Sequence, residues 1–322
     1  MNREYIDSII RMVANTGAVR TVYHSDTESG VFAQQLVIAT FSELFRHEFP
    51  ETKWVNGGLI SLNTSIDEGA ATYAFTELIA SGRAAIVADN SNDLPAAEVT
   101  GRNNIRAVHT IADYVTYSTQ EIRSSRMNGM FDIAQEKARS AREAMDRTLD
   151  DLIRSGSPQH SLEGIVNHTG IIVANAVTGN WQTATALQIV ADVTTAINTI
   201  MNQSDGVETP VNVLFDVASF TRLSTLQNSV ASDITVLDYL KMAFPMVTRW
   251  DWEPGLKDVS ATGGASMLVY NPDPMKIRAV IPMGMRALPP QQDDLNFRLA
   301  FEMRFGGVMA PRPRSVLRLD GV

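Results

Sequence analysis

Two histidines flank a glutamate in the one stretch of the chain whose residue types suggest catalysis. His160, Glu163 and His168 lie within nine consecutive positions, and imidazole and carboxylate groups together carry out general acid–base chemistry. One interpretation is therefore a cytosolic α/β hydrolase or lyase that acts through these three side chains. A metal site at the same place would need further carboxylates, because Glu163 is the single nearby candidate. We expect instead that both histidines are solvated or bonded within the fold.

The other templates for catalysis or ligand binding are absent from the sequence. No GxGxxG follows an expected strand, and neither GxxxxGK[ST] nor HExxH occurs. The acidic pairs Asp150–Asp151 and Asp293–Asp294 are adjacent, so their side chains point apart on a helix or a strand. Trp250 and Trp252 flank Asp251, which is more typical of a packed edge than of a ligand-stacking site. We expect no enzyme, no cofactor and no metal site, and a structural or assembly role.

The composition excludes further classes of protein. The chain has 322 residues, no cysteine and a formal net charge of −9. Without cysteine there is no disulfide framework, zinc ribbon, iron–sulfur cluster or thiol nucleophile, and the acidic balance argues against a nucleic-acid reader with a broad basic face. The N-terminus lacks a secretory pattern, and the uncharged stretch Gly164–Ala191 has too many polar residues for a membrane span. We expect a soluble, intracellular protein of one large or two modest domains.

The elements that would position these residues include one long helix. Ser118-Thr-Gln-Glu121 is a capping box, and apolar residues then recur in steps of three and four until Gly156 and Pro158 end the pattern. The pattern predicts a single helix over Ser118–Ser155, a rod about 50 Å long. A coiled-coil strand is the alternative, although the alanine-rich seam and the helical spacing favour a packed helix.

Before this helix, alternating residues predict a long antiparallel hairpin. Thr72–Thr76 and Ile105–Ile111 alternate between apolar and polar types, and a cluster of turn residues, Asp89–Pro95, lies between them. Asp89 and Asp93 bracket that turn, with too few oxygen donors for calcium. The hairpin has no full apolar face in the sequence. We therefore expect it to be marginal alone and to need a partner surface.

The remaining segments predict a mixed α+β fold. A polar stretch at residues 1–30 precedes an expected helix at Val31–Phe49. Further helices are expected near Thr183–Met201, Val217–Leu226 and Ile234–Ala243, and strands near Val211–Phe215, Met246–Trp250, Ser266–Tyr270, Lys276–Ile281 and Phe297–Arg304.

The order of these parts resembles the major capsid protein of tailed bacteriophages, which has the Hong Kong 97-type fold. An N-terminal arm, a long hairpin, a long capped helix, an α/β segment and closing strands follow one another along nearly the whole chain. Several local stretches are also similar to one of its capsid families. They are Gly82–Pro95, Tyr117–Ile122, His160–His168, Arg304–Val308 and Arg312–Val316.

The resemblance implies an α+β, Hong Kong 97-like capsid fold with four parts. Residues 1–65 would be the N-terminal arm and the start of the peripheral domain, and residues 66–112 the extended loop that lies over a neighbouring subunit. Residues 113–157 and 283–322 would form the peripheral domain with its spine helix, and residues 158–282 the axial domain. The candidate contacts between subunits are the loop tip and three nearby arginines: Asp89, Asn90, Ser91, Asn92, Asp93, Leu94, Pro95, Arg83, Arg102 and Arg106.

The function that the resemblance implies is structural. Copies of the chain would self-assemble into the pentamers and hexamers of an icosahedral shell around double-stranded DNA, which is held without sequence specificity. The implied partners are other copies, a separate scaffolding protein, a portal and decoration proteins, without a membrane. The implied location is the virion capsid, after assembly in the host cytoplasm. The close alternative is an encapsulin-like nanocompartment shell, which a cargo enzyme in place of DNA would identify.

Two features depart from parts of that family. Some members weld their shells by an isopeptide bond between a lysine of the extended loop and an asparagine, but residues 66–112 contain no lysine. We expect no such bond here, and arginine–carboxylate pairs between subunits instead, because 22 of the 27 basic residues are arginine. Some members also begin with a long helical scaffolding segment. This N-terminus is too short for one, so we expect a mature chain or a separate scaffolding protein.

Overall fold

A computed structural model describes residues 49–86, 96–128, 133–229, 233–260 and 264–322. The chain divides into two units, Met1–Pro50 and Glu51–Val322, and the fold described below is that of the second. The predicted helix at Val31–Phe49, apart from its last residue, and the predicted turn at Asp89–Pro95 lie outside the described residues. Among the described helices, none is long and apolar enough to cross a membrane.

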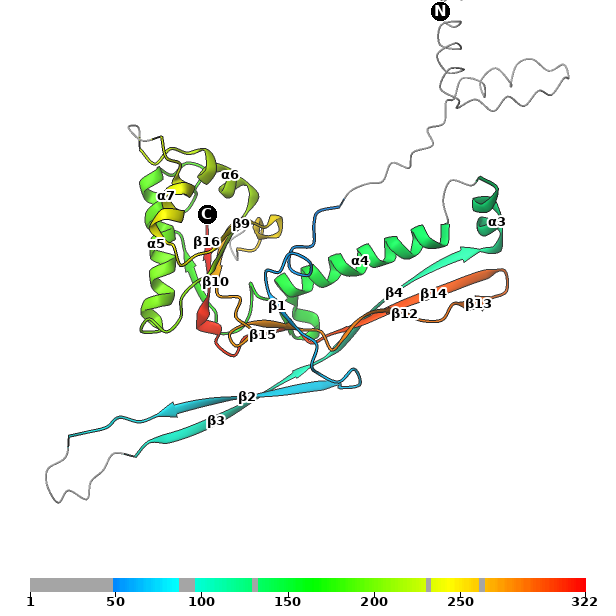
Figure 1. Cartoon of the computed structure of the whole chain (residues 1–322), viewed down its shortest axis with the longest axis horizontal. Coiled ribbons are helices and arrows are strands. Elements are labelled where there is room, and N and C mark those ends of the chain that lie inside the picture. The colour runs from blue at the N-terminus through cyan, green and yellow to red at the C-terminus, as the bar shows by residue number, and fades with distance from the viewer. Residues whose placement is uncertain (1–48, 87–95, 129–132, 230–232, 261–263) are drawn as a thin grey trace, which may run out of the picture. The chain divides into compact units, whose positions relative to one another are not determined.

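A five-stranded sheet, here called the central sheet because it contributes to both hydrophobic cores, can be followed in Figure 1. Its strand order is β7-β16-β10-β8-β9. β10 is buried along its whole length, and pairs with β16 and β8 in antiparallel registers. The strands are β7 (Ile172–Asn175), β8 (Asn212–Phe215), β9 (Arg249–Trp252), β10 (Ser266–Tyr270) and β16 (Val316–Asp320).

Both faces of this sheet are covered, so it belongs to two hydrophobic cores. Successive side chains of a strand point to opposite faces. Met267 and Val269 of β10 accordingly join the core beneath helices α5 (Ala186–Gln203), α6 (Val217–Thr225) and α7 (Val236–Ala243), whereas Leu268 and Tyr270 join the other core. Continuous apolar strands such as Ser266–Tyr270 are the expected result of burial on both faces.

The second core lies between one long helix and a second sheet. The buried stripe of α4 (Ile133–Ser155), which includes Met145 and Ile153, packs with β4 (His109–Ser118) and β14 (Asn296–Phe305). β4 and β14 pair over ten residues each, from His109–Phe305 to Ser118–Asn296. The same sheet contains β12 (Met283–Ala287) and β13 (Gln291–Asp293). A small three-stranded sheet joins β1 (Ser61–Asn63), β11 (Arg278–Val280) and β15 (Val308–Met309). A two-stranded sheet joins β5 (Gly156–Ser157) and β6 (Leu162–Glu163).

The single predicted helix over Ser118–Ser155 is wrong. The structure describes two helices there, α3 (Thr119–Asn128) and α4. Lys137 of α4 lies 2.9 Å from Glu121 of α3 and also donates to the backbone oxygen of Thr116. In one continuous helix, residues 16 positions apart would be about 24 Å apart, so α4 must fold back toward the start of α3.

The capping box itself is confirmed. The Glu121 N–H donates to the Ser118 hydroxyl at 3.1 Å, and the Ser118 N–H donates to the Glu121 carboxylate at 3.0 Å. The hydrogen bond from Lys137 and the one from the Ser118 backbone lower the pKa of Glu121. The sequence therefore predicted where the helical segment begins, but not that it bends.

Most other predicted elements are confirmed, with one correction. The predicted strand Ile105–Ile111 is divided between β3 (Glu98–Ala107) and β4, because buried Val108 donates its N–H to Ala71 and the chain changes sheets there. The last strand, β16, lies in the five-stranded sheet between β7 and β10, and its Val316, Leu317 and Leu319 are buried.

The core beneath α5 provides a test of this packing. Ile197 is fully buried on α5, whereas Leu187 on the same helix is 77% exposed. We expect Ile197→Ala to lower the free energy of unfolding by about 2–5 kcal/mol, because it leaves a cavity. Leu187→Ala should change it by less than about 0.5 kcal/mol. Urea titrations of both variants measure the difference, and equal losses would contradict the assigned orientation of α5.

Candidate functional site

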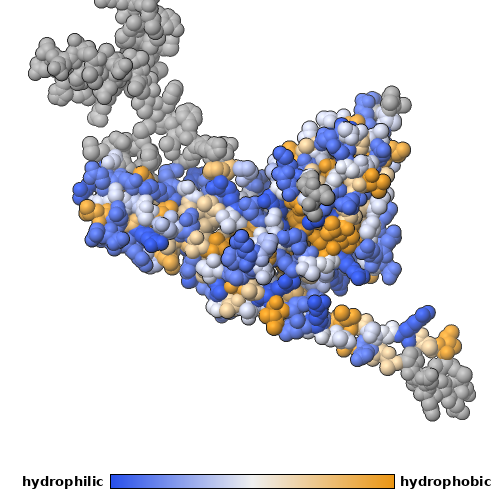
Figure 2. Space-filling view, turned by 180° about the vertical axis from the view of Figure 1, so that it is seen from behind, coloured by the Kyte–Doolittle hydropathy of each residue, from blue (hydrophilic) through white to orange (hydrophobic). Residues whose placement is uncertain are grey.

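One part of the described fold, a two-stranded hairpin, is not explained by packing on the subunit's own core. It is called the hairpin arm here and consists of β2 (Thr72–Ser81) and β3 (Glu98–Ala107). The strands pair antiparallel from Thr72–Ala107 to Ser81–Glu98. This confirms the predicted hairpin. In Figure 2, hydrophobic and hydrophilic residues alternate along the described part of the arm. Leu78 and Ile105 are 73% and 67% exposed, although apolar side chains of this size normally find cover.

The register gives the arm two faces of different character. Paired residues lie on the same side of a sheet and the next pair on the opposite side. One side, here called the uncharged face, has no ionisable residue, and all ten of its side-chain positions are exposed: Thr72, Ala74, Thr76, Leu78, Ala80, Val99, Gly101, Asn103, Ile105 and Ala107. The other side, here called the charged face, contains Tyr73, Phe75, Glu77, Ile79, Ser81, Glu98, Thr100, Arg102, Asn104 and Arg106.

The charged face is fastened to the core at its root. Tyr73 is buried with Val280 and Met309, and its hydroxyl donates to the Gly306 carbonyl at 3.1 Å. Burial raises the pKa of Tyr73 to about 12, so this donor keeps its proton. A Cβ at Gly306 would lie 2.8 Å from the Tyr73 ring, and the close approach therefore requires glycine at this position.

An ion pair ties the other strand of the arm to the same place. Arg106 lies 2.7 Å from the Glu163 carboxylate. Glu163 also accepts a hydrogen bond from the Thr169 hydroxyl at 2.6 Å, and His168 Nε2 lies 3.2 Å from it. Burial alone would raise the pKa of Glu163, but the Thr169 hydrogen bond and the nearby cationic groups outweigh it and lower the pKa. Burial lowers the pKa of His168, although the charge of Glu163 opposes this shift.

The predicted catalytic set is only partly brought together. Glu163 and His168 are in contact, but the His160 ring lies beside His109, with ring centroids 5.4 Å apart. Each carboxylate oxygen of Glu163 already has a partner within the chain. Glu163 therefore holds the root of the arm through Arg106. Among the described residues, no group of three acidic or histidine side chains could hold a metal ion.

The structure describes only some of the residues predicted to form contacts between subunits. Asp89–Pro95 lie outside the described residues. Arg102 is exposed on β3, and Arg83 is exposed just after β2, which leaves both accessible to another molecule. Arg106 has its partner within the same chain, and no local sequence signal identified Glu163 as that partner because the two residues are 57 positions apart.

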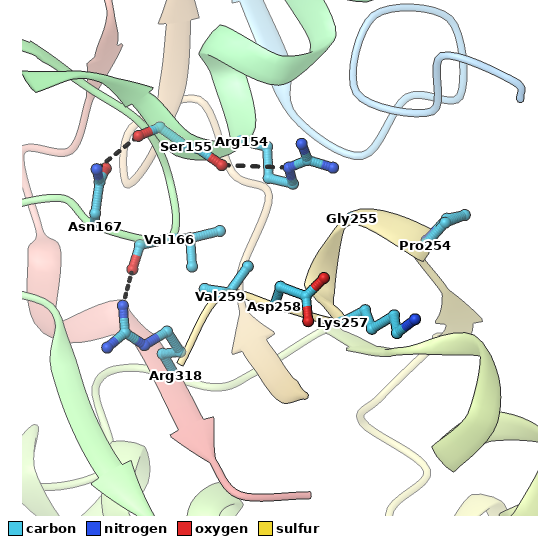
Figure 3. A pocket seen from close by; sticks show the side chains of 10 residues that line it. All are labelled: Arg154, Ser155, Val166, Asn167, Pro254, Gly255, Lys257, Asp258, Val259 and Arg318. Carbon is cyan, nitrogen blue, oxygen red and sulfur yellow. Dashed lines mark hydrogen bonds between the residues drawn. The ribbon is translucent and has the colours of Figure 1, made fainter. Parts of the chain in front are cut away.

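A cavity of about 460 Å³ lies near the C-terminal end of α4 (Figure 3). Arg154, Lys257 and Arg318 line it together with Asp258. The two arginines are already paired, Arg154 with Asp151 and Arg318 with Asp320. The cavity therefore offers little unpaired positive charge, and we assign no ligand to it.

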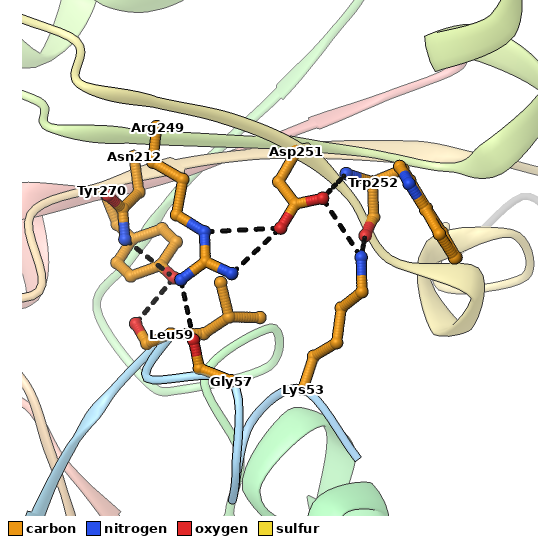
Figure 4. A network of polar contacts seen from close by, with 8 residues as sticks. All are labelled: Lys53, Gly57, Leu59, Asn212, Arg249, Asp251, Trp252 and Tyr270. Carbon is orange, nitrogen blue, oxygen red and sulfur yellow. Dashed lines mark hydrogen bonds and ion pairs between the residues drawn. The ribbon is translucent and has the colours of Figure 1, made fainter. Parts of the chain in front are cut away.

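The segment that follows the first unit is clamped to the central sheet (Figure 4). Lys53 donates to the Asp251 carboxylate at 3.0 Å and to the Trp252 carbonyl, and its ammonium lies 3.6 Å from the Trp252 ring centroid. Arg249 bridges Asp251 and the Gly57 carbonyl. These charge-assisted contacts hold the chain where it enters the second unit.

Carboxylates beneath this clamp are unusually buried. Asp150 accepts hydrogen bonds from the N–H groups of Trp54 and Val55. Glu253 is 3% exposed, and it accepts one long hydrogen bond from Gly255. Burial, reinforced by the charge of Asp150, raises the pKa of Glu253 to about 7, although Arg154 and Lys53 oppose the shift.

The raised pKa makes stability depend on pH. The folded protein binds more protons than the unfolded chain between the ordinary pKa of 4.5 and about 7, so the free energy of unfolding falls as pH rises through this window. We expect Glu253→Gln to stabilise the protein by about 2–3 kcal/mol at pH 8 and by much less at pH 5. Glu143→Gln, at an exposed site of α4, is the control and should show no such gain in urea titrations. A gain from Glu253→Gln that does not change with pH would contradict the assignment.

Comparison with known proteins places this arrangement in a family. The family model described as "Major capsid protein" matches residues 82–322. The capsid of Myoviridae phage XM1 has a similar structure, with a TM-score of 0.80 and 17% identity over 92% of this chain and 100% of that chain. A Mycobacterium phage Bobi structure matches with a TM-score of 0.64 and 13% identity, over 92% of this chain and 100% of that one.

A virus-like particle from Pyrococcus furiosus is a more distant structural match, with a TM-score of 0.54 and 10% identity over 81% of this chain and 90% of that chain. No curated protein sequence matches. The fold confirms the expected α+β, Hong Kong 97-type architecture, and the family is structural, not enzymatic. The family match over residues 82–322 and the shared fold along nearly the whole chain show that this protein belongs to the major capsid protein family.

Proposed function

We propose that this chain is the repeating subunit of a bacteriophage shell, which self-assembles into the pentamers and hexamers of an icosahedral capsid around double-stranded DNA. The observation that carries this proposal is the hairpin arm. It has a firmly held root and one face that its own chain leaves uncovered, and a two-stranded element of this kind has little stability without a further surface. Contact with neighbouring copies would supply that surface.

The parts of the chain take corresponding roles in this proposal. Residues 1–65 supply the N-terminal arm and the start of the peripheral domain, and residues 66–112 the extended loop. Residues 113–157 with 283–315 form the peripheral domain, and residues 158–282 with β16 form the axial domain, because β16 pairs with β7 and β10. The clamp at Lys53 and the root at Arg106 then attach the entering segment and the extended loop to the second unit.

The proposed partners extend beyond other copies of the chain. A separate scaffolding protein, a portal and decoration proteins would accompany assembly in the host cytoplasm, and the finished shell would be the virion capsid. The net charge of −9 is consistent with packaged DNA held without sequence-specific contacts, since an acidic wall does not bind phosphates tightly.

An encapsulin-like nanocompartment shell is the second candidate, favoured by the likeness to the virus-like particle from Pyrococcus furiosus. The likeness to the phage XM1 capsid is closer, with a TM-score of 0.80 against 0.54. The contents of purified particles separate the two functions, since DNA supports the capsid and a copurifying enzyme supports the nanocompartment.

The first test is the size of the purified protein. We expect shells, rings or capsomers in gel filtration and negative-stain electron microscopy, because each subunit both contributes and receives contacts. Denatured particles should run near 35 kDa, since the loop lacks the lysine needed for an isopeptide bond. A protein that stays a compact monomer or dimer at high concentration would rule out the proposed assembly.

The second test addresses the root of the arm. We expect Arg106→Ala to lower particle yield several-fold while lowering the free energy of unfolding by less than about 1 kcal/mol, because the Arg106–Glu163 pair is partly exposed. A loosened arm loses more conformational entropy when it docks. Arg139→Ala, which removes an exposed pair with Glu143 on α4, is the matched control. Equal particle yields from both variants would show that the root does not position the arm.

A further inference from the structure

We propose that the uncharged face of the hairpin arm is the side that docks onto a second copy of this chain, while the charged face remains toward solvent beyond the root. This inference rests on the proposed function. It adds which side of the arm is buried on assembly, a property that only the strand register reveals.

The two faces differ in what the subunit itself already covers. The charged face begins with Tyr73 and Phe75, which pack on the core at the root. The uncharged face is exposed from Thr72 to Ala80 on β2 and from Val99 to Ala107 on β3. A Cβ placed on Gly101 would contact only the neighbouring side chains of Leu78 and Thr76, which shows that these three positions lie together on one open surface.

Desolvation also favours the uncharged face. Docking would bury Leu78, Val99 and Ile105, which are 63–73% exposed, and apolar burial contributes about 25 cal/mol per Å². The charged face offers one such aliphatic residue, Ile79, which is 58% exposed. Burial of the charged face would remove Glu77, Glu98 and Arg102 from water. That costs several kcal/mol per ion unless each charge is paired with good geometry.

The size of the face identifies the occupant. Ten residues per strand give a length of about 33 Å, and two strands a width of about 10 Å, so the face covers roughly 300 Å². A stable one-to-one complex buries about 800 Å² of surface on each partner. A single contact of this size is therefore too small for an unrelated partner. In a closed assembly of identical copies, each copy gives one arm and receives another, so many such contacts add together.

The cysteine-free sequence allows a direct test. Thr76 on the uncharged face and Thr100 on the charged face are both exposed threonines in the arm, so Thr76→Cys and Thr100→Cys form a matched pair of single-cysteine variants. The rate of reaction with a maleimide dye is measured for each full-length variant in purified particles and again after dissociation. We expect Thr76→Cys to react at least tenfold more slowly in particles, and Thr100→Cys to react at similar rates in both states.

The outcomes separate this inference from the proposed function. Equal protection of the two cysteines, no protection of either, or protection of Thr100→Cys alone would overturn the face assignment while assembly itself stands. A second pair, Thr76→Lys and Thr100→Lys, gives an independent measure, and we expect only Thr76→Lys to lower particle yield. If the unaltered protein forms no particles under any condition, the proposed function fails instead.

Discussion

The fold of the second unit depends on one sheet whose inner strands β8 and β10 are buried on both faces. Leu268 and Tyr270 of β10 belong to the core with α4, and Met267 and Val269 to the core with α5, α6 and α7. Because a one-residue shift of register would exchange the two sets of side chains, the two cores fix each other. The Tyr270 hydroxyl extends this constraint, since it donates to the Leu59 carbonyl and holds the entering segment against the sheet.

The two attachments use different chemistry from the cores. The clamp around Lys53 and the root around Arg106 are made of charges and hydrogen bonds to backbone carbonyls. Apolar packing is non-directional, whereas a bidentate arginine or a tyrosine hydroxyl specifies a direction. An element that must extend away from the core in a defined direction therefore needs polar contacts at its base, and the buried Tyr73, fitted against Gly306, shows how closely that base is packed.

Local signals in the sequence predicted the elements well, and long-range pairing explains what was missed. The Ser118–Glu121 capping box, the hairpin and strand Ser266–Tyr270 follow from residues adjacent in sequence. The bend between α3 and α4 was missed because apolar spacing continues across Asn128-Gly129, a pair typical of helix ends. The Arg106–Glu163 pair and the place of β16 depend on partners far along the chain. The uncharged face became visible only when the register set Thr76 opposite Asn103.

The arginine excess takes on a different meaning in the folded chain. Arginine–carboxylate pairs were expected between subunits, yet Arg106, Arg249, Arg312 and Arg318 all pair with carboxylates of their own chain. Their planar forks serve first to fix strands and loops within one subunit. The root of the arm is held by an ionic contact, whereas the uncharged face has no ionisable residue, so orientation and adhesion can be separate. In the proposed shell, charge would set the direction in which the arm extends, and weak apolar contact, repeated around the assembly, would supply the binding.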